Sequence, residues 1–120
     1  MSDPAVLFGI RSCDTVRKAR RWLDQRGVAY RYHDLRDDGV EPADLTAWCE
    51  ALGWEALLNR RSTTWRGLTD TQRAAAGDAE GACALLRTHP TLLRRPLLAV
   101  DGRYWAGFDE AAYRSLLGQS

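Results

Sequence analysis

The start of the chain switches between two kinds of hydrophobic pattern, and this order constrains the fold more than any other feature. Ala5–Ile10 is a short apolar run of the kind that forms a buried strand. Asp14–Arg26 has the spacing of a helix with one apolar face, and Gly27 ends that pattern. Val28–His33 alternates as a second strand does. Strand, helix and strand within about 30 residues predict a βαβ unit with a right-handed crossover.

The end of the chain predicts a hairpin followed by a helix. Leu97–Val100 and Arg103–Ala106 are strand-like, and Asp101-Gly102 between them suits a two-residue type I′ turn. Asp109 is expected to begin a final helix. The apolar residues of this helix are Tyr113, Leu116 and Leu117.

The middle of the chain is predicted to be helical. Pro42 suits the first position of a helix, and Asp78 suits the cap of a later one. The apolar face of the first helix would consist of Leu45, Trp48, Cys49 and Leu52. The inner face of the later helix would consist of Ala79, Ala82, Cys83 and Leu86.

The segments around these two helices are shorter. Glu55–Leu58 and Thr69–Ala76 are predicted as two further helices. Asn59–Gly67 is polar and rich in arginine, and it is predicted to be a loop. Thr88–Pro96 contains two prolines and is expected to be irregular.

The order of these elements predicts the fold class. A β-α-β half, a helical insert at about residues 41–90, and a β-β-α half form an α/β, thioredoxin-like fold with a mixed four-stranded sheet. A length of 120 residues with 45% hydrophobic residues predicts a single domain, 1–120, with one adequate core.

Composition and charge exclude several classes of protein. With 17 basic and 16 acidic residues, the net charge of +1 provides no field for direct nucleic-acid binding. No run approaches the roughly 20 apolar residues that span a bilayer, so no membrane association is expected. Asp3 precedes the first apolar run where a signal peptide would have basic residues.

Three cysteines without a CxxC pair favour a reduced, cytoplasmic setting. His33 and His89 lack metal-ligand spacing, and no metal is expected.

Cys13 is the candidate nucleophile because it lies at the predicted turn from the first strand into the first helix. The unpaired backbone N–H groups of a helix N-terminus carry partial positive charge, which favours the reactive thiolate. Arg11 and Arg17 would reinforce this effect, and Asp14 would oppose it.

Two related cysteine chemistries are excluded by spacing. A phosphatase loop needs an arginine six positions after its cysteine, where this chain has Ala19. A dithiol redox motif needs a second cysteine three positions after the first, where this chain has Val16. Cys13 is therefore a lone thiol at this turn, and an outside thiol, most economically glutathione, would resolve its intermediates. Otherwise Cys49 or Cys83 would have to become accessible, although both are expected in the core.

Two arginine-bearing segments are candidates for substrate binding. Pro96 precedes the predicted hairpin, where a cis peptide bond would suit a thioredoxin-like proline loop beside the sulfur. Arg95 would then face an anionic substrate near Cys13. A second cationic loop contains Arg60, Arg61 and Arg66 with Thr63, Thr64 and Trp65. Aromatic residues between arginines can stack on RNA, but at this net charge we expect a loop folded over the active-site face.

These residues together resemble the arsenate-reductase-like (ArsC/Spx) family of thioredoxin-fold proteins, in particular its YffB-like branch, for which a glutathione-dependent thiol reductase activity is proposed. The resemblance covers about Val6 to Leu117. It rests on Gly9-Ile10-Arg11-Ser12-Cys13-Asp14-Thr15, Lys18-Ala19-Arg20-Arg21-Trp22-Leu23, Gly53-Trp54-Glu55-Ala56-Leu57-Leu58-Asn59, Thr63-Thr64-Trp65-Arg66 and Arg95-Pro96-Leu97-Leu98.

The resemblance implies a nucleophilic role for Cys13. In arsenate reductases three arginines hold the oxyanion, and Arg95 matches one of them. Asn59 occupies the place of another, with Arg60 and Arg61 following, and Gly107 lies near the place of the third. Loss of these charges makes arsenate a less suitable substrate and leaves thiol chemistry intact.

The resemblance also implies an alternative of a different class. Spx-like proteins bind the C-terminal domain of the RNA polymerase α subunit and regulate transcription, and many of them carry a CxxC switch that Val16 removes here. A third hypothesis is that the chain is a folded module that has lost catalysis.

We therefore expect a glutathione-dependent thiol/disulfide reductase with Cys13 as nucleophile. Glutathione would be a co-substrate, with no bound cofactor, and glutaredoxin or the polymerase α subunit would be further candidate partners. Thr15 would donate a hydroxyl hydrogen bond to the thiolate. The expected substrate-binding residues are Ser12, Thr15, Asn59, Arg60, Arg61, Arg95 and Pro96.

Overall fold

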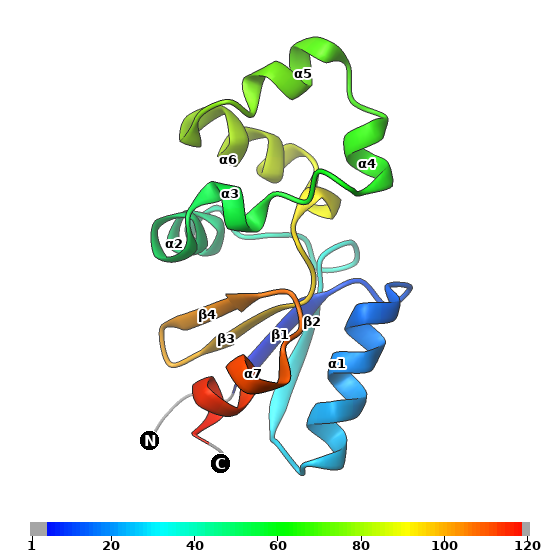
Figure 1. The fold of residues 1–120 in the computed structure, drawn as a ribbon, viewed down its shortest axis with the longest axis vertical. Coiled ribbons are helices and arrows are strands. Elements are labelled where there is room, and N and C mark those ends of the chain that lie inside the picture. Colours follow the sequence, from blue (N-terminus) through cyan, green and yellow to red (C-terminus); the bar gives the residue numbers. More distant parts are fainter. Residues whose placement is uncertain (1–4, 119–120) are drawn as a thin grey trace. The chain divides into compact units, whose positions relative to one another are not determined.

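The computed structural model describes residues 5–118, which form two compact units (Figure 1). The sheet unit consists of the two ends of the chain, up to Leu35 and from Arg95. The helical unit is the segment Arg36–Arg94 between them. The expectation of one domain with an insert at about 41–90 stays a prediction. None of the helices in the described residues has the length and apolar character needed to cross a bilayer.

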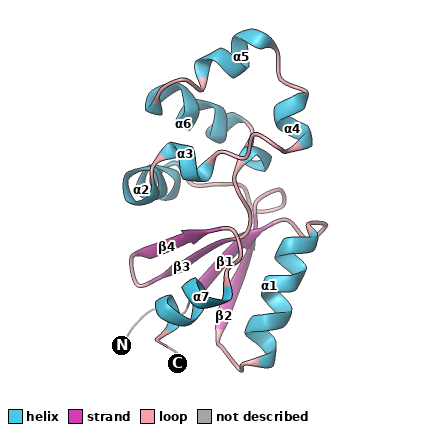
Figure 2. Cartoon of the chain, in the orientation of Figure 1, coloured by secondary structure: helices cyan, strands magenta, loops and turns pink. Residues whose placement is uncertain are grey.

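The sheet unit has a mixed four-stranded sheet with the strand order β2-β1-β3-β4. The central strand β1 pairs in parallel with β2 and antiparallel with β3, which in turn pairs antiparallel with β4. Two helices, α1 and α7, complete the unit (Figure 2). The elements are β1 (Ala5–Gly9), α1 (Asp14–Gln25), β2 (Tyr30–Asp34), β3 (Leu97–Val100), β4 (Arg103–Ala106) and α7 (Glu110–Leu117). This order of elements confirms the thioredoxin-like fold class.

Helices α1 and α7 cover one face of the sheet with an aromatic cluster between them. The rings of Trp22 and Tyr113 meet edge to face with centroids 5.8 Å apart, and Phe108 lies 5.0 Å from Tyr113. Such T-shaped pairs add to the stabilisation that burial already provides. The buried residues of this core are Ala5, Leu7, Ala19, Trp22, Leu23, Leu98, Val100 and Tyr113.

The turn between β3 and β4 follows the sequence prediction. Asp101 and Gly102 both have positive φ, 49° and 77°, as the two central residues of a type I′ turn require. Val100 and Arg103 pair directly across it. At the other predicted cap, Asp109 accepts a hydrogen bond from the backbone N–H of Ala112, which confirms it as the N-cap of α7.

The helical unit contains five α-helices and one 3₁₀ turn within its described residues. They are α2 (Pro42–Leu52), α3 (Trp54–Leu57), α4 (Thr63–Arg66), α5 (Asp70–Ala75), α6 (Ala79–Thr88) and η1 (Pro90–Leu92). Two predictions were too simple. The segment expected as a loop contains α4, because the Ser62 hydroxyl caps a helical turn by accepting from the Trp65 N–H. The segment expected to be irregular contains η1, which Pro90 begins.

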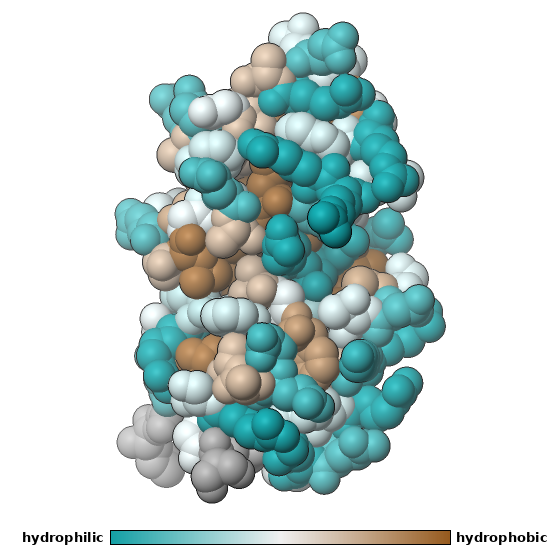
Figure 3. Space-filling view, viewed as in Figure 1, coloured by the Kyte–Doolittle hydropathy of each residue, from teal (hydrophilic) through white to brown (hydrophobic). Residues whose placement is uncertain are grey.

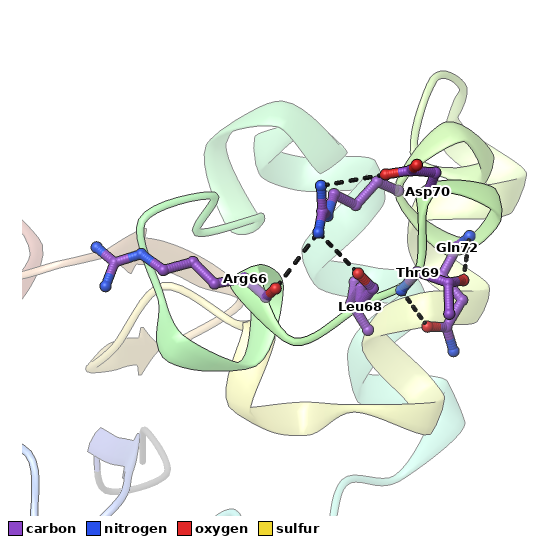
Figure 4. Close-up of polar contacts among 6 residues, drawn as sticks. Arg66, Leu68, Thr69, Asp70 and Gln72 are labelled. Carbon is purple, nitrogen blue, oxygen red and sulfur yellow. Dashed lines mark hydrogen bonds and ion pairs between the residues drawn. The ribbon is translucent and has the colours of Figure 1, made fainter.

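Hydrogen bonds hold the short connection between the end of α4 and the start of α5 (Figure 4). Thr69 and Gln72 form a capping box in which each side chain binds the other's backbone N–H. The Arg73 guanidinium donates to the carbonyls of Arg66 and Leu68 at 3.3 and 2.8 Å. The capping box satisfies backbone N–H groups at the start of α5, and Arg73 satisfies carbonyls at and just beyond the end of α4. Hydrophilic side chains gather over α4 in Figure 3.

Helices α2 and α6 pack against each other around the apolar core of the helical unit. Asp78 accepts from the Gly81 N–H at 2.8 Å, which confirms the predicted cap of α6. Ala79 is exposed, so its predicted place on the inner face is wrong; it stands in the first turn, whereas Ala82 and Leu86 are buried. Cys49 and Cys83 are half-buried, which corrects the expectation that both lie in the core.

Candidate active site

Cys13 is the N-cap residue of α1 and is half-buried. Its backbone is extended, with φ −81° and ψ 124°, and its side chain makes no capping hydrogen bond. The Cys13 N–H donates to the Ile10 carbonyl at 3.0 Å, and the Arg17 N–H donates to the Cys13 carbonyl at 3.1 Å. The backbone is therefore held by bonds on both sides, while the sulfur stays uncommitted beside the first N–H groups of a 12-residue helix.

Gly9 allows the strand before this turn to lie close to the helix after it. A Cβ at position 9 would lie 2.7 Å from a methyl carbon of Val16, which is closer than packed carbon atoms approach. Val16 is fully buried. The absence of a side chain at Gly9 thus sets the separation between β1 and the first turn of α1.

Asp34, at the end of β2, anchors the turn from the neighbouring strand. Its side chain is 3% exposed, and its Oδ2 accepts from the Arg11 N–H and from the Tyr32 hydroxyl, both at 3.1 Å. The Leu35 N–H donates to the Gly9 carbonyl at 2.8 Å. Burial, followed by the hydrogen bond to Asp34, raises the pKa of Tyr32 to about 12. Asp34 therefore belongs to the support of the Cys13 turn, a role that sequence reasoning missed because it depends on strand pairing.

Arg17 holds the turn from the solvent side. Its Nε donates to the Arg11 carbonyl at 3.1 Å, and one terminal nitrogen donates to the Ser12 carbonyl at 3.3 Å. The other terminal nitrogen pairs with the Asp14 carboxylate at 3.2 Å. Both side chains of this pair are largely exposed, so solvent weakens the attraction. The cation and the anion expected to act oppositely on Cys13 are thus paired with each other.

The Arg95–Pro96 peptide bond is cis, as predicted. Leu97 pairs with Phe8 across the β1–β3 ladder, so Pro96 enters the sheet beside the end of β1 from which the Cys13 turn departs. The Gly107 N–H donates to the Pro96 carbonyl at 2.8 Å. Pro96 is buried and Arg95 is half-buried. The predicted closeness of Pro96 to the sulfur stays a prediction.

Ser12 and Thr15 are exposed on either side of Cys13. The role of Thr15 as a hydroxyl donor to the sulfur also stays a prediction. Ser12, Cys13 and Thr15 follow β1, and Arg95 and Pro96 precede β3, so both segments leave the sheet unit at the same end of the sheet.

The helical unit brings together the remaining predicted residues in a cavity of about 340 Å³. It is lined by Glu55, Leu58, Asn59, Arg60, Arg61 and Arg94. Arg60 lies between two indoles, with its guanidinium carbon 5.9 Å from the Trp54 ring and 5.7 Å from the Trp65 ring. Three guanidinium groups against one carboxylate make this cavity suited to an anion.

A bridge between two distant segments shapes this cavity. Leu58 pairs with Leu93, the Asn59 N–H donates to the Leu92 carbonyl at 2.8 Å, and the Arg94 N–H donates to the Leu57 carbonyl at 2.7 Å. Arg94 was not predicted as a site residue. Its adjacency to Arg95 was visible in the sequence, but only this bridge assigns the two arginines to different units.

No group of three or more potential metal-ligating side chains occurs among residues 5–118. The described residues therefore offer no cluster in which a metal ion would be held.

Residues 8–116 match the ArsC family. The chain belongs to the ArsC family. A solved structure of a YFFB protein is 42% identical, with a TM-score of 0.89 over 94% of this chain and 98% of the other. An uncharacterised protein of Haemophilus influenzae is 40% identical over 110 residues, 92% of this chain and 96% of the relative.

A third relative is the global transcriptional regulator Spx of Streptococcus mutans, which is 29% identical over 116 residues, 93% of this chain and 82% of the relative. ArsC membership and a half-buried cysteine at a helix N-terminus together support a thiol oxidoreductase type of chemistry.

Proposed function

We propose that this ArsC-family protein is a glutathione-dependent thiol/disulfide reductase with Cys13 as its nucleophile. The observation that carries the proposal is the Cys13 side chain itself, which is partly accessible and makes no capping bond at the start of α1. A thiolate there interacts favourably with the helix dipole, and it is the form that attacks disulfides.

The reaction needs two exchange steps. The Cys13 thiolate attacks the glutathione sulfur of a mixed disulfide, a protein–glutathione bond forms, and the substrate leaves as a thiolate that takes a proton from water. The thiolate of a second glutathione then attacks the bound glutathione sulfur. Glutathione disulfide leaves and Cys13 returns as a thiolate, so one disulfide is reduced and one is formed.

In this proposal an outside thiol resolves the intermediate, since Cys13 is the one cysteine in the sequence of the sheet unit. The chain's other thiols, Cys49 and Cys83, belong to the helical unit. In this proposal the Pro96 segment positions the incoming thiol, and Arg95 attracts a carboxylate of glutathione. Ser12 and Thr15 supply hydroxyl groups beside the sulfur.

The cavity of the helical unit is proposed to bind a carboxylate independently. Arg60, Arg61 and Arg94 line it, and Glu55 limits its positive charge. Asn59 brings an amide, and its Oδ1 already accepts from the Arg61 N–H at 3.0 Å. This arrangement suits a partly solvated carboxylate better than a trianionic oxyanion, which needs several converging charge-assisted bonds.

Arsenate is therefore a poor candidate substrate. Gly107, near the place of the third oxyanion arginine, has φ +92°, a conformation that strains residues with a side chain. We expect weak or no arsenate turnover in a glutaredoxin-coupled assay, and robust saturable turnover would contradict this expectation.

The test is glutathione-dependent reduction of a glutathionylated peptide, measured with the wild type and with Cys13→Ser. The double variant Cys49→Ser/Cys83→Ser is the control, and it is expected to keep turnover. Mass spectrometry of trapped protein is expected to find glutathione on Cys13. Turnover that survives Cys13→Ser would overturn the proposal. Arg95→Ala is expected to weaken glutathione binding more than Arg114→Ala, which lies on α7.

The similarity to Spx supports a second candidate function, binding of the RNA polymerase α subunit. Pull-down with the purified C-terminal domain of that subunit tests it directly. Binding without glutathione exchange at Cys13 would favour the regulatory function, and exchange without binding would favour the reductase.

A further inference from the structure

A second, smaller cavity belongs to the sheet unit, and no residue of the Cys13 turn lines it. Its volume is about 180 Å³, and we name it the α1–α7 cavity because α1, the start of α7 and the connection before α7 supply its walls. The lining residues are Lys18, Arg21, Trp22, Gln25, Phe108 and Glu110. All six belong to the same compact unit, so the fold of that unit alone forms the cavity.

The helical wall of the cavity follows from the spacing of the sequence. Lys18, Arg21, Trp22 and Gln25 recur at the i, i+3, i+4 and i+7 positions of one side of α1. Trp22 is buried, whereas the other three side chains of this wall are exposed. The cavity therefore has an aromatic base and a polar, flexible rim.

Two aromatic rings form the apolar part of the cavity. Trp22 is 7% exposed, and its ring meets that of Phe108 edge to face, with centroids 6.2 Å apart. Tyr113 contacts the same indole with a centroid separation of 5.8 Å, and the Arg26 guanidinium carbon lies 4.4 Å from its centre. The indole is therefore held in place, and the half-buried Phe108 offers ring surface to the cavity.

The Trp22 indole also carries a polar group that the fold leaves unused. Its Nε1–H is buried and has no hydrogen-bond acceptor among the described residues. An indole nitrogen only donates, and buried donors in native proteins nearly always have a partner. Because this donor is already removed from water in the free protein, a ligand oxygen that accepts from it gains a hydrogen bond without dehydrating the donor.

The charges around the cavity favour an anion. Lys18 and Arg21 contribute two cations, and neither forms an ion pair with an acid within residues 5–118. The Lys18 ammonium lies 5.9 Å from the centre of the Phe108 ring, at the mouth of the apolar part. Glu110 opposes them with one negative charge. The lining thus carries a net charge of +1, which one carboxylate would balance.

We propose that the α1–α7 cavity binds a small aromatic monocarboxylate of about the size of benzoate. The ring packs on Phe108, and a carboxylate oxygen accepts from the Trp22 Nε1–H once the flexible side chain of Lys18 or Gln25 moves aside. Arg21 balances the charge of the ligand. The volume suits one ring, since it is below the roughly 300–1,000 Å³ of sites for drug-sized ligands. This binding needs no thiol, so it is a property separate from the proposed reductase function.

The experiment is an NMR titration of the full-length, ¹⁵N-labelled protein with sodium benzoate. The Trp22 indole resonance is identified as the one that Trp22→Phe removes. We expect it to move downfield and to saturate with a dissociation constant on the order of 1 mM. The indole resonance of Trp105, which is exposed on β4 and is identified with Trp105→Phe, should stay in place.

Two further compounds separate the two halves of the proposed recognition. Acetate has the carboxylate without the ring, and benzylammonium has the ring with the opposite charge. Both are expected to bind at least about tenfold more weakly than benzoate. Trp22→Phe keeps an aromatic ring and loses the donor, so it should weaken benzoate binding by about fivefold to tenfold.

Exposed charges supply variants that test the site even if Trp22→Phe does not fold, because binding can also be followed from the backbone amides of α1. Arg21→Gln should weaken benzoate binding by about threefold to tenfold, and Glu110→Gln should tighten it by about twofold to threefold. Arg87→Gln on α6 is the control and should change nothing.

The proposal fails if benzoate at concentrations on the order of 10 mM leaves the Trp22 indole resonance unmoved. It also fails if benzylammonium moves that resonance equally, or if Arg21→Gln and Glu110→Gln bind benzoate as the wild type does. Turnover at Cys13 can succeed or fail without affecting any of these results, since the same titration can be made with Cys13→Ser.

Discussion

The backbone N–H of Arg11 donates a hydrogen bond to the buried carboxylate of Asp34, which ties the Cys13 turn to the neighbouring strand. The bond joins residues from opposite sides of the βαβ crossover, at the edge of the sheet where β1 and β2 end. The loop that bears the sulfur is therefore held by strand pairing as well as by its own helix.

Replacement of Asp34 by alanine tests this link. The Arg11 N–H and the Tyr32 hydroxyl would both lose their acceptor, and we expect a loss of about 2–3 kcal/mol in the free energy of unfolding. Asp34→Asn keeps one acceptor oxygen and should lose less. Urea denaturation measures stability, and the rate of iodoacetamide labelling at Cys13 reports the turn. Asp24→Ala, exposed on α1, is the control. Unchanged stability and labelling in Asp34→Ala would refute the anchoring role.

Gly9→Ala tests the close approach of β1 to α1. The new methyl group would lie 2.7 Å from a Val16 methyl carbon, and we expect the overlap to destabilise the protein by about 1–3 kcal/mol. Val16→Ala removes the opposing methyl groups and leaves a cavity by itself. The double variant should be more stable than the sum of the two single losses predicts, and a double-mutant cycle measures this coupling. Strict additivity would contradict the proposed contact.

The cavity lined by Arg60, Arg61 and Arg94 is expected to bind carboxylates with an affinity that depends on its positive charge. Arg61→Ala should weaken binding of S-methylglutathione, which carries carboxylates and no reactive thiol, by about threefold to tenfold. Binding should also weaken as salt rises, because the guanidinium groups are exposed. Isothermal titration measures both effects. Arg31→Ala on β2 is the matched control, since Arg31 is exposed and lies in the sheet unit. Equal losses in the two variants would indicate a general charge effect without a site.

Because of the buried Tyr113 side chain, we expect the free energy of unfolding to decrease at alkaline pH. Its side chain is fully buried and donates to the Gly107 carbonyl at 3.3 Å, and burial raises its pKa above the ordinary value. The folded state then keeps a proton that the unfolded state releases above about pH 10. The contribution of protonated Tyr113 to the free energy of unfolding is therefore fully present below that pH, and it decreases as the pH rises toward the raised pKa. Between pH 8 and pH 10.5 we expect it to fall by about 1 kcal/mol.

Tyr113→Phe should remove this contribution, so the free energy of unfolding should fall less with pH, by the same amount. The variant also loses the hydrogen bond to the Gly107 carbonyl, which lowers stability at every pH. Urea denaturation at the two pH values measures it. An identical slope in the wild type and in Tyr113→Phe would contradict the assignment.

The elements that sequence reasoning predicted well are those whose chemistry is local. Asp101-Gly102 and the caps Asp78 and Asp109 act within three residues, so their patterns are visible in the printed chain. α4 was missed because Thr63–Arg66 has no apolar period, and only a serine cap begins it.

The candidate site divides in the same way. Cys13 was found because a strand-to-helix turn is a local pattern. Asp34 and Arg94 were missed because their roles depend on β1–β2 pairing and on the Leu58–Leu93 bridge, which join residues far apart in the sequence.

The pairing of Leu7 with Leu98 at the centre of the sheet has a consequence for the order of folding. It joins residues about 90 positions apart, and closing so long a loop is slow because its entropy must be lost before the contact stabilises anything. The βαβ segment leaves the ribosome with one edge of its central strand β1 unpaired. The segment Arg36–Arg94, whose contacts are nearer in sequence, is made before β3. The edge of β1 that pairs with β3, beside the Pro96 segment, is therefore completed only when the last quarter of the chain has been synthesised.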